Sequence, residues 1–314
     1  MPQQGLREVE HEITVSAPAA DVHRLIADVA NWPRIFPPTV HAEQLERHGA
    51  DERIRIWATA NGEPKNWTSR RTLHPDTLRI DFRQEVSAPP VAAMGGSWII
   101  EELSADTSRV RLLHDYRAVG DDPEALAWID QAVDRNSRTE LAALKTNVEL
   151  VAGDSGVLLS FEDSVPIDGS AKDVYDFLNE ANLWQERLPH VASVRLGEPA
   201  PGLQTLEMDT RTKDGSTHTT ASVRVCFPHQ RIVYKQTTLP ALMTLHTGYW
   251  LLEEDGNGVR ATSQHTVAVN TANIASILGP DAGIAEAHEF IRAALSGNSR
   301  ATLGHAKAYA ESRR

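Results

Sequence analysis

The sequence predicts an α+β protein of two tandem domains, in each of which a curved antiparallel sheet wraps around a long C-terminal helix. Three observations lead to this prediction. The same short patterns occur twice along the 314 residues, in the same order. Each half starts with a strand pattern and a short helix, continues with several strands, and ends in a long helical pattern. A sheet that wraps one helix leaves space beside it, so we expect an internal cavity in each domain.

Length and composition fit two globular domains. Hydrophobic residues make up 41% and charged residues 24% of the chain, and the net charge is −12. This charge argues against a nucleic-acid binder, which needs a basic surface. There is no run of about 18 apolar residues and no signal-peptide pattern, so we expect no membrane span and no secretion. The single cysteine, Cys226, excludes a disulfide framework and a thiolate cluster, so we expect no metal and a cytoplasmic location.

The duplication rests on five pairs of matching segments. Val15–Trp32 matches Val165–Trp184, and "NSRTELAALK" near the end of the first half matches "NSRATLGHAK" near the end of the second. The other pairs are TSRRTLHPDTLRIDF with TASVRVCFPHQRIVYK, GGSWIIEEL with TGYWLLEED, and VRLLHDYRA with VRATSQHTV. Gly and Asp break the helical pattern near residues 151–157. We therefore expect homologous domains at residues 1–153 and 154–314.

The elements of each half follow one order. After the first strand, the short helix opens with Pro18 in the first half and with the capping-box-like SAKD at 170–173 in the second. A Trp/Pro turn follows, NWPRIFPP or NLWQERLPH, and then several strands with turn residues between them. The long helices are expected from about residue 124 to 150 and from about 282 to 310.

The segment WTSRRTL, residues 67–73, is a strand that points an arginine inward. Strand side chains alternate between faces, so Arg71 shares the apolar face with Trp67, Ser69 and Leu73. An isolated buried charge is too costly to keep for packing alone. We therefore expect the partner of Arg71 to be a ligand or water in the cavity rather than protein. The alternative is an arginine at the strand edge whose head reaches solvent.

Two other elements of the first half contribute inward polar groups. In VRLLHDYR, His114 and Tyr116 share the inner face and Asp115 points outward. In the last helix Asn136 interrupts the apolar stripe, so we expect it to point inward. His114 and Asn136 have an alternative interpretation as ordinary polar residues of the packed core.

The second half has a different pattern. Alternation places Arg224 on a polar face with Ser222, which indicates an outward orientation, although a polar-lined cavity would give the same pattern. His265 lies among apolar residues and is expected to point inward, at the position that Tyr116 occupies in the first half.

These side chains suit enol and carbonyl chemistry. A guanidinium can stabilise an enolate oxygen in a dry site, and a histidine can move protons near neutral pH. We therefore predict Arg71 and His114 as catalytic residues. Gly-rich phosphate loops, HExxH and GxSxG motifs are absent from the sequence.

Several of these segments closely resemble the first half of di-domain aromatase/cyclases from bacterial type II polyketide synthases. They are NWPRIFPPTV, NWTSRRTLHPDTLRIDF, MGGSW, LLHDY and NSRTELAALK. The resemblance covers nearly the whole chain and is looser in the second half. It implies a helix-grip fold, as in START and Bet v 1 proteins, in each domain. It also implies regiospecific first-ring aldol cyclisation, dehydration to an aromatic ring, or both, without a cofactor.

The substrate implied by this resemblance is a poly-β-ketone linked through phosphopantetheine to an acyl carrier protein. The implied partners are that carrier protein and other components of the minimal polyketide synthase, with no nucleic acid and no membrane. The alternative is a START-like carrier of lipid or polyketide without catalysis. Chain length, ring regiochemistry, prior ketoreduction and the identity of the active domain are left open.

The resemblance also assigns site residues. The W-x-S-x-R strand of related cyclases corresponds to Trp67, Ser69 and Arg71, and their pocket histidine corresponds to His114. The predicted substrate-binding residues are Trp32, Phe36, Trp67, Ser69, Met94, Trp98, Tyr116 and Asn136. A pocket in the second domain, either a degenerate pocket or a second site for aromatisation, is expected around Ser222, Arg224, Trp250, His265 and Asn298.

Overall fold

The computed structural model describes residues 5–60, 62–152, 156–211, 217–256 and 258–313. The chain divides into two compact units, Met1–Asp154 and Ser155–Arg314. The boundary expected between residues 153 and 154 lies outside the described residues. Each unit is described by itself below.

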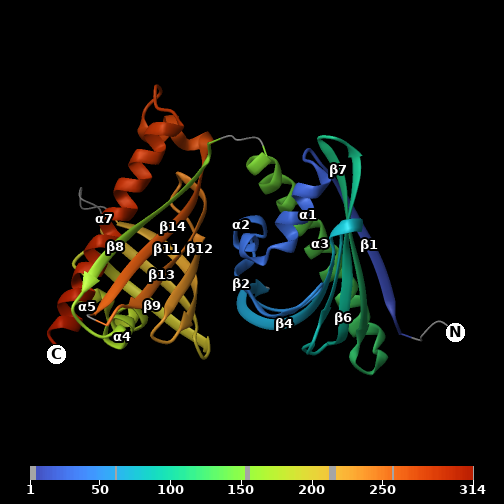
Figure 1. Ribbon diagram of the computed structural model, residues 1–314, viewed down its shortest axis with the longest axis horizontal. Coiled ribbons are helices and arrows are strands. Elements are labelled where there is room, and N and C mark those ends of the chain that lie inside the picture. Colours follow the sequence, from blue (N-terminus) through green and yellow to red (C-terminus); the bar gives the residue numbers. More distant parts are fainter. Residues whose placement is uncertain (1–4, 61, 153–155, 212–216, 257, 314) are drawn as a thin grey trace. The chain divides into compact units, whose positions relative to one another are not determined.

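The first domain is a seven-stranded antiparallel sheet with one long helix (Figure 1). Its strands pair in the order β1-β7-β6-β5-β4-β3-β2. The strands are β1 (Arg7–Val15), β2 (Thr39–His48), β3 (Asp51–Ala60), β4 (Glu63–His74), β5 (Arg79–Gln84), β6 (Val91–Ser104) and β7 (Thr107–Ala118). The helices are α1 (Ala19–Ala27), α2 (Trp32–Ile35) and α3 (Pro123–Ala152).

The second domain repeats this architecture. Its sheet has the order β8-β14-β13-β12-β11-β10-β9, which is the same path as in the first domain. The strands are β8 (Leu158–Ile167), β9 (Val191–Ala200), β10 (Leu203–Arg211), β11 (Thr217–Phe227), β12 (Arg231–Thr238), β13 (Met243–Glu254) and β14 (Val259–Val269). The helices are α4 (Ala171–Asn179), α5 (Trp184–Arg187), α6 (Ile274–Leu278) and α7 (Ile284–Glu311). The predicted duplication and element order are confirmed.

The long helix of each domain closes the concave side of its sheet, because one face of the helix is apolar. Leu141, Leu144 and Val148 of α3 belong to a buried cluster with Ile80, Trp98 and Leu112 of the sheet. Leu303, Ala306 and Ala310 of α7 pack in the same way against Ile232, Leu252 and Ala261. Burial of this apolar surface is the main source of stability for each domain.

Local sequence signals account for the start of the short helices. Pro18 precedes α1 as its N-cap residue, where its missing N–H has no cost. Ser170 caps α4, and its hydroxyl accepts a hydrogen bond from the backbone N–H of Asp173 at 3.0 Å. The Trp/Pro segments form short helices, α2 and α5, rather than open turns.

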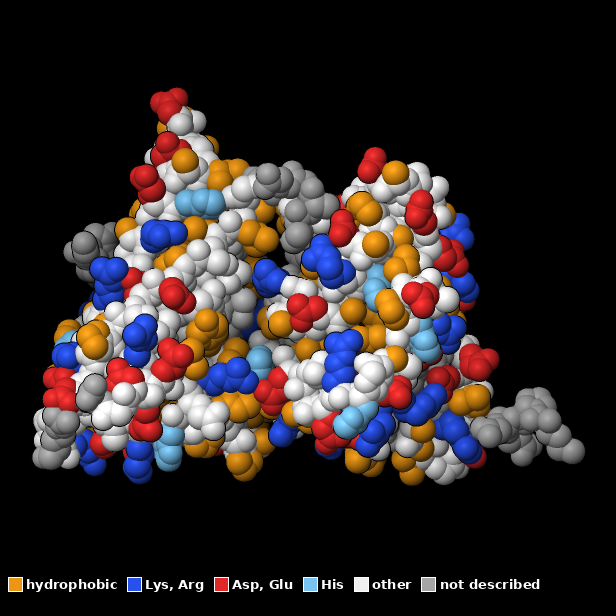
Figure 2. All heavy atoms as spheres, viewed as in Figure 1, with side chains coloured by type: hydrophobic (Ala, Val, Ile, Leu, Met, Phe, Trp, Pro, Cys, Tyr) orange, Lys and Arg blue, Asp and Glu red, His pale blue; other side chains and the backbone are white. Residues whose placement is uncertain are grey.

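The visible face of each domain carries charges of both signs. Acidic and basic side chains lie interspersed on the face of each domain that Figure 2 shows. Among the described residues, no helix is long and apolar enough to span a bilayer.

Gly96 allows two side chains to meet across a strand. Phe82, Gly96 and His114 are neighbours across β5, β6 and β7, and the two rings lie 5.6 Å apart between centroids. A Cβ at Gly96 would lie 2.8 Å from Phe82 Cζ and 1.9 Å from the backbone oxygen of Leu113. Because Gly96 has no side chain, the phenyl ring of Phe82 can lie beside the imidazole of His114.

We expect Gly96→Ala to lower the stability of the first domain by about 3 kcal/mol or more, because a rigid backbone oxygen cannot yield to the new methyl group. Thermal unfolding of the full chain measures this change. Gly304→Ala in α7 is the matched control, because a Cβ there meets nothing within 4 Å. The control should raise stability by about 0.5–1 kcal/mol through helix propensity. Equal melting temperatures for the two variants would contradict this account of Gly96.

Candidate active site

Arg71 is buried and its partners are protein groups. It is 3% exposed, and its Nε donates to Glu52 Oε1 at 2.7 Å while Nη2 also bonds that oxygen. Nη1 donates to the carbonyl of Ile26 at 3.1 Å and Nη2 to that of Ala27 at 2.6 Å. These four hydrogen bonds leave one of the five guanidinium N–H groups unused. Both expectations for Arg71, a non-protein partner and a solvent-exposed head, are therefore wrong.

The guanidinium of Arg71 fixes the segment that follows α1. Ile26 and Ala27 are the last residues of that helix, where unpaired carbonyls and the helix dipole favour a cation. The guanidinium also lies 5.2 Å from the centroid of the Trp32 ring, and Trp32 Nε1 donates to Ile26 O at 2.9 Å. Burial lowers the pKa of Arg71, and the Glu52 carboxylate opposes that shift. Arg71 thus links its own strand, β4, to the end of α1 and to the segment that contains Trp32.

Arg224 repeats this arrangement without the carboxylate. It is 2% exposed, donates through Nη2 to the carbonyl of Leu178 at 2.6 Å, and lies 5.5 Å from the Trp184 ring centroid. The residue across the strand pair is Gln204, where the first domain has Glu52 opposite Arg71. Arg224 Nη1 and Gln204 Oε1 have no hydrogen-bond partner among the described residues.

The outward orientation expected for Arg224 is therefore wrong. Its face of β11 is polar because it meets the carbonyl end of α4 and an indole ring, not because it meets water. Burial lowers the pKa of this guanidinium. Ser222, two residues earlier on the same face, is half-buried.

A pocket of about 240 Å³ opens beside the Arg71 ion pair. Residues of β2, β3 and β4 line it, and they are Glu46, His48, Asp51, Glu52, Arg53, Arg70, Arg71 and Thr72. All but Thr72 have titratable side chains, so this pocket differs from the apolar interior expected of a polyketide site.

His114 lies inside the wrapped sheet, as expected. Its Nδ1 is 3.4 Å from Ser137 Oγ on α3, and Phe82 stands edge-on to its ring. Burial lowers the pKa of His114 to about 4, so the free imidazole is neutral at pH 7. The side chain is only half-buried, and Nε2 has no hydrogen-bond partner among the described residues. This nitrogen is therefore available to bind a ligand on the inner face.

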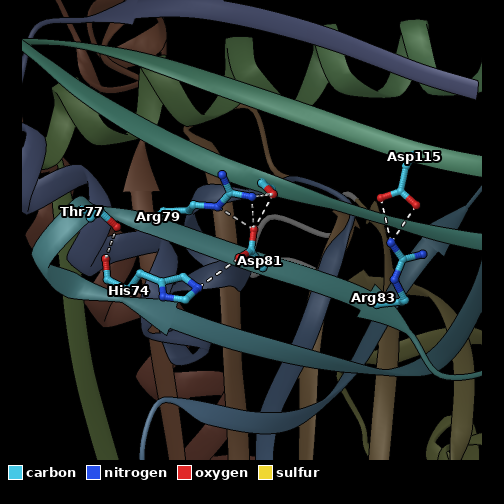
Figure 3. A network of polar contacts seen from close by, with 7 residues as sticks. His74, Thr77, Arg79, Asp81, Arg83 and Asp115 are labelled. Carbon is cyan, nitrogen blue, oxygen red and sulfur yellow. Dashed lines mark hydrogen bonds and ion pairs between the residues drawn. The ribbon is translucent and has the colours of Figure 1, made fainter.

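The two neighbours of His114 on β7 follow the predicted alternation. Asp115 lies on the outer face, where Arg83 Nη2 donates to both its carboxylate oxygens, at 2.7 and 2.8 Å (Figure 3). Tyr116 faces inward and is fully buried. Its hydroxyl donates to Asp130 Oδ1 of α3 at 2.6 Å, and burial together with this bond raises its pKa. The phenol of Tyr116 is thus held by the helix.

The inward orientation expected for Asn136 is wrong, and Asn298 of the second domain is exposed in the same way. The adjacent residues, Ser137 and Ser299, face the sheet instead and are buried. Ser137 is four residues from both Val133 and Leu141, which places it on the apolar stripe. The prediction was in error by one residue, or 100° around the helix.

The predicted aromatic residues fall into two groups. Trp32 and Trp67 are half-buried and pack beside the cluster of Ile54 and Ile56. Phe36 and Trp98 are stacked at 5.9 Å between centroids in the closed core. Met94 is half-buried beside Tyr116, Ser69 is buried, and Trp250 is half-buried in the second domain. The half-buried members are the ones with surface left for a ligand.

The second domain gathers a polar cluster around His265. Tyr234 Oη lies 2.8 Å from His265 Nδ1 and 3.3 Å from His246 Nε2, and those two imidazole nitrogens lie 2.9 Å apart. On the other side of the ring, Ser299 Oγ lies 2.7 Å and Ser263 Oγ 3.2 Å from His265 Nε2. Burial lowers the pKa of His265 to about 4 and that of His246 to about 3.

The counterpart of His265 is His114 and not Tyr116, as the sheet register shows. Gly248 pairs with Tyr234 on one side and His265 on the other, as Gly96 pairs with Phe82 and His114. The correspondence from sequence was wrong because it aligned β7 with β14 at the first residues of the two segments. The sheet register instead aligns these strands through Gly96 and Gly248 on the neighbouring strands.

The residues of these sites that were missed from sequence alone include Glu52, Ser137, Glu140, Gln204, Tyr234, His246 and Ser299. Glu52 does carry a signal, since it alternates with Ile54 and Ile56 on the buried face of β3. Glu140 follows Ser137 by one turn of α3 and is half-buried. It has no hydrogen-bond or ion-pair partner among the described residues, and burial raises its pKa to about 7.

Metal ligands do not gather in either site. In the part of the chain that the structure describes, no three His, Cys, Asp or Glu side chains are placed to hold a metal ion together.

Comparison with protein families gives the same result for both halves. Family models described as "Polyketide cyclase / dehydrase and lipid transport" match residues 15–140 and 159–311.

Two curated relatives from Streptomyces match nearly end to end. The chain is 57% identical over 297 residues to the granaticin polyketide synthase bifunctional cyclase/dehydratase of Streptomyces virginiae, covering 94% of this chain and 97% of the relative. It is 45% identical over 320 residues to the actinorhodin polyketide synthase bifunctional cyclase/dehydratase of Streptomyces coelicolor, covering 99% of each.

Two crystal structures share the whole fold. The di-domain ARO/CYC BexL from the BE-7585A biosynthetic pathway is 69% identical, with a TM-score of 0.93 over 97% of this chain and 99% of that chain. The di-domain ARO/CYC StfQ from the steffimycin pathway is 36% identical, with a TM-score of 0.87 over the same shares.

We expect Glu52→Gln to lower the free energy of unfolding of the first domain by about 3–5 kcal/mol, because it leaves the Arg71 guanidinium buried without a counter-charge. Urea unfolding of the full chain measures this. Glu46→Gln is the matched control, since Glu46 pairs with Arg53 at the surface, and should cost less than about 1 kcal/mol. Equal costs for the two variants would show that the buried pair contributes no more than a surface pair.

Glu140 should make stability fall as pH rises. Below its ordinary pKa of 4.5 the carboxyl is neutral in both states, and between 4.5 and about 7 only the unfolded chain releases the proton. Wild type should therefore lose up to about 3 kcal/mol relative to Glu140→Gln between pH 5 and pH 8. Urea unfolding of both proteins across this range measures the difference. Parallel stability curves would exclude a buried, unpaired carboxyl.

Proposed function

The chain belongs to the polyketide cyclase/dehydrase family and is a bifunctional cyclase/dehydratase of aromatic polyketide biosynthesis, and we propose that its first domain closes the first ring at His114. The observation that carries this proposal is the accessible imidazole nitrogen, His114 Nε2, inside a largely apolar wrapped sheet. The proposed substrate is a poly-β-ketone held by phosphopantetheine on an acyl carrier protein of the minimal synthase. The cytoplasmic location stays a prediction from the sequence.

Ring closure needs a proton acceptor and then a proton donor. A methylene between two carbonyls loses a proton, its carbon attacks a distant carbonyl, and the resulting alkoxide takes a proton. With Nδ1–H directed to Ser137 Oγ, His114 Nε2 is the free acceptor for the first step. The enolate that forms beside it favours the imidazolium, and that ion returns its proton to the alkoxide.

The half-buried apolar side chains of the first domain support this role. Trp32, Trp67 and Met94 offer surface on which a folded ketone chain can pack. The surrounding protein excludes water, which strengthens each polar contact made inside.

Arg71 supports the site through its neighbours. It holds the end of α1 and the Trp32 ring in place, which makes it a positioning residue in this proposal. A direct contact between its remaining N–H and a substrate carbonyl stays a prediction.

We expect His114→Ala to slow regiospecific ring closure about 10²- to 10⁴-fold, because a positioned acid/base contributes that much. Product analysis of a reconstituted minimal synthase, with and without the protein, measures it. The matched variant His265→Ala, at the same position of the second domain, should keep ring closure. A wild-type product profile from His114→Ala would refute the proposal. If the wild-type protein does not change the product profile of the minimal synthase, the alternative of a carrier without catalysis would be favoured.

A further inference from the structure

The inner faces of the two domains differ at the positions nearest the conserved histidine. Both domains keep the glycine, the histidine and the helix serine in equivalent places. The second domain replaces three apolar side chains by polar ones. These replacements, from first to second domain, are Phe82 to Tyr234, Met94 to His246, and Leu112 to Ser263. The added groups all lie around one imidazole, that of His265.

Tyr234 is the added group with access to the interior. A Cβ at Gly248 would lie 2.7 Å from Tyr234 Oη, so the glycine leaves the path by which the phenol reaches across β13 to His265. The phenol is half-buried, whereas His246 and His265 are buried. Tyr234 is therefore the most exposed of these three residues.

The hydrogen bonds allow Tyr234 to offer its proton to a ligand. His265 is neutral and has one N–H. When Nδ1 carries the proton, Nε2 accepts from the Ser299 hydroxyl at 2.7 Å and Nδ1–H donates to Tyr234 Oη at 2.8 Å. The phenolic O–H can then donate either to His246 Nε2 at 3.3 Å or to a ligand. The same N–H stabilises the phenolate that forms when the proton leaves.

Three buried polar atoms of the second domain, Arg224 Nη1, Gln236 Oε1 and His246 Nδ1, have no hydrogen-bond partner among the described residues. Arg224 is the cross-strand neighbour of Tyr234. Buried polar groups are nearly always paired in folded proteins, so these exceptions leave hydrogen-bonding capacity for a polar ligand or water. Inward-facing Ser222 and Trp250 keep partial exposure, which gives that ligand room.

We propose that Tyr234 is the proton-transfer residue of a second catalytic site, in the second domain, which dehydrates the cyclic β-hydroxy ketone produced by ring closure. This inference rests on the proposed function, which supplies that ketone. His265 is a positioning residue here, since it acts through the phenol, and Ser299 orients its ring.

In the proposed dehydration, Tyr234 both gives a proton to the substrate and takes one from it. The phenol gives its proton to the ring hydroxyl, the C–O bond breaks, and water leaves. The phenolate, held by His265 Nδ1–H, then takes a proton from the adjacent ring carbon. The C–H bond breaks, its electrons form the C=C bond, and the phenol is restored.

The first domain lacks this donor. Phe82 occupies the position of Tyr234 beside His114, so its imidazole has no phenol to pass a proton to a leaving hydroxyl. An imidazole suffices to remove and return a proton during ring closure. Loss of water that starts from the protonated catalyst needs an acid aimed at the departing oxygen, and the second domain has a phenol in that place where the first domain has Phe82.

The test compares Tyr234→Phe with wild type in the full chain, within the reconstituted synthase. Mass spectrometry follows the ring-closed product and the same product less one water. We expect water loss to slow about 10²-fold or more while ring closure continues. The variant places in the second domain the residue that the first domain already has, so it should fold. Tyr249→Phe is the matched control, since it removes a phenol from the opposite face of the neighbouring strand, and should leave both steps unchanged.

A second pair of variants tests the positioning role. His265→Asn keeps a donor near the place of Nδ1 and should retain more water loss than His265→Ala. Unchanged water loss in Tyr234→Phe, with ring closure intact, would overturn this inference and leave the proposed function standing. Absence of ring-closed product with wild type would overturn both. Equal loss of both steps in Tyr234→Phe would overturn the assignment of dehydration alone to this site.

Discussion

Each domain depends on an arginine that holds the end of its short helix. Arg71 and Arg224 donate to helix-terminal carbonyls and lie against the tryptophan of the next segment. A hydrogen bond from a charged donor contributes about 1.5–3 kcal/mol, and the helix dipole adds up to about 2 kcal/mol. The helix, the strand and the tryptophan therefore keep one geometry, and the interior beside them is shaped before any substrate enters.

The two arginines differ in how fully they are satisfied. Glu52 neutralises Arg71, so the cation of the first domain is committed to the fold. In the second domain Gln204 stands in the place of Glu52 and supplies no charge, which leaves Arg224 with an unused donor. A buried cation without a counter-charge is tolerated only where another polar group can meet it. The domain that looked less like a site from sequence thus holds a buried guanidinium nitrogen that makes no hydrogen bond among the described residues.

Sequence reasoning located the elements and the inner faces of the first domain, because alternation and helical period are local properties. The strand of Trp67 to Leu73 and the inward His114 follow from those periods alone. The errors arose where tertiary partners decide the outcome. Arg224 lies on a polar face that a helix end covers, and Asn136 lies beside Ser137, one position off the buried stripe. The match of His265 to His114 needed the strand register, which no single strand contains.

The glycine opposite each histidine explains how the same sheet architecture can place an apolar neighbour beside the histidine in one domain and a polar neighbour in the other. Gly96 and Gly248 occupy the same point of the sheet in their domains. The residue paired with each glycine on the preceding strand, Phe82 or Tyr234, therefore reaches over the glycine to the imidazole. A phenylalanine there gives an apolar neighbour and an isolated imidazole. A tyrosine at that point gives a phenol within hydrogen-bond distance of the same nitrogen. The backbone therefore fixes where the contact occurs, and the single ring hydroxyl decides whether the contact can carry a proton to a leaving group.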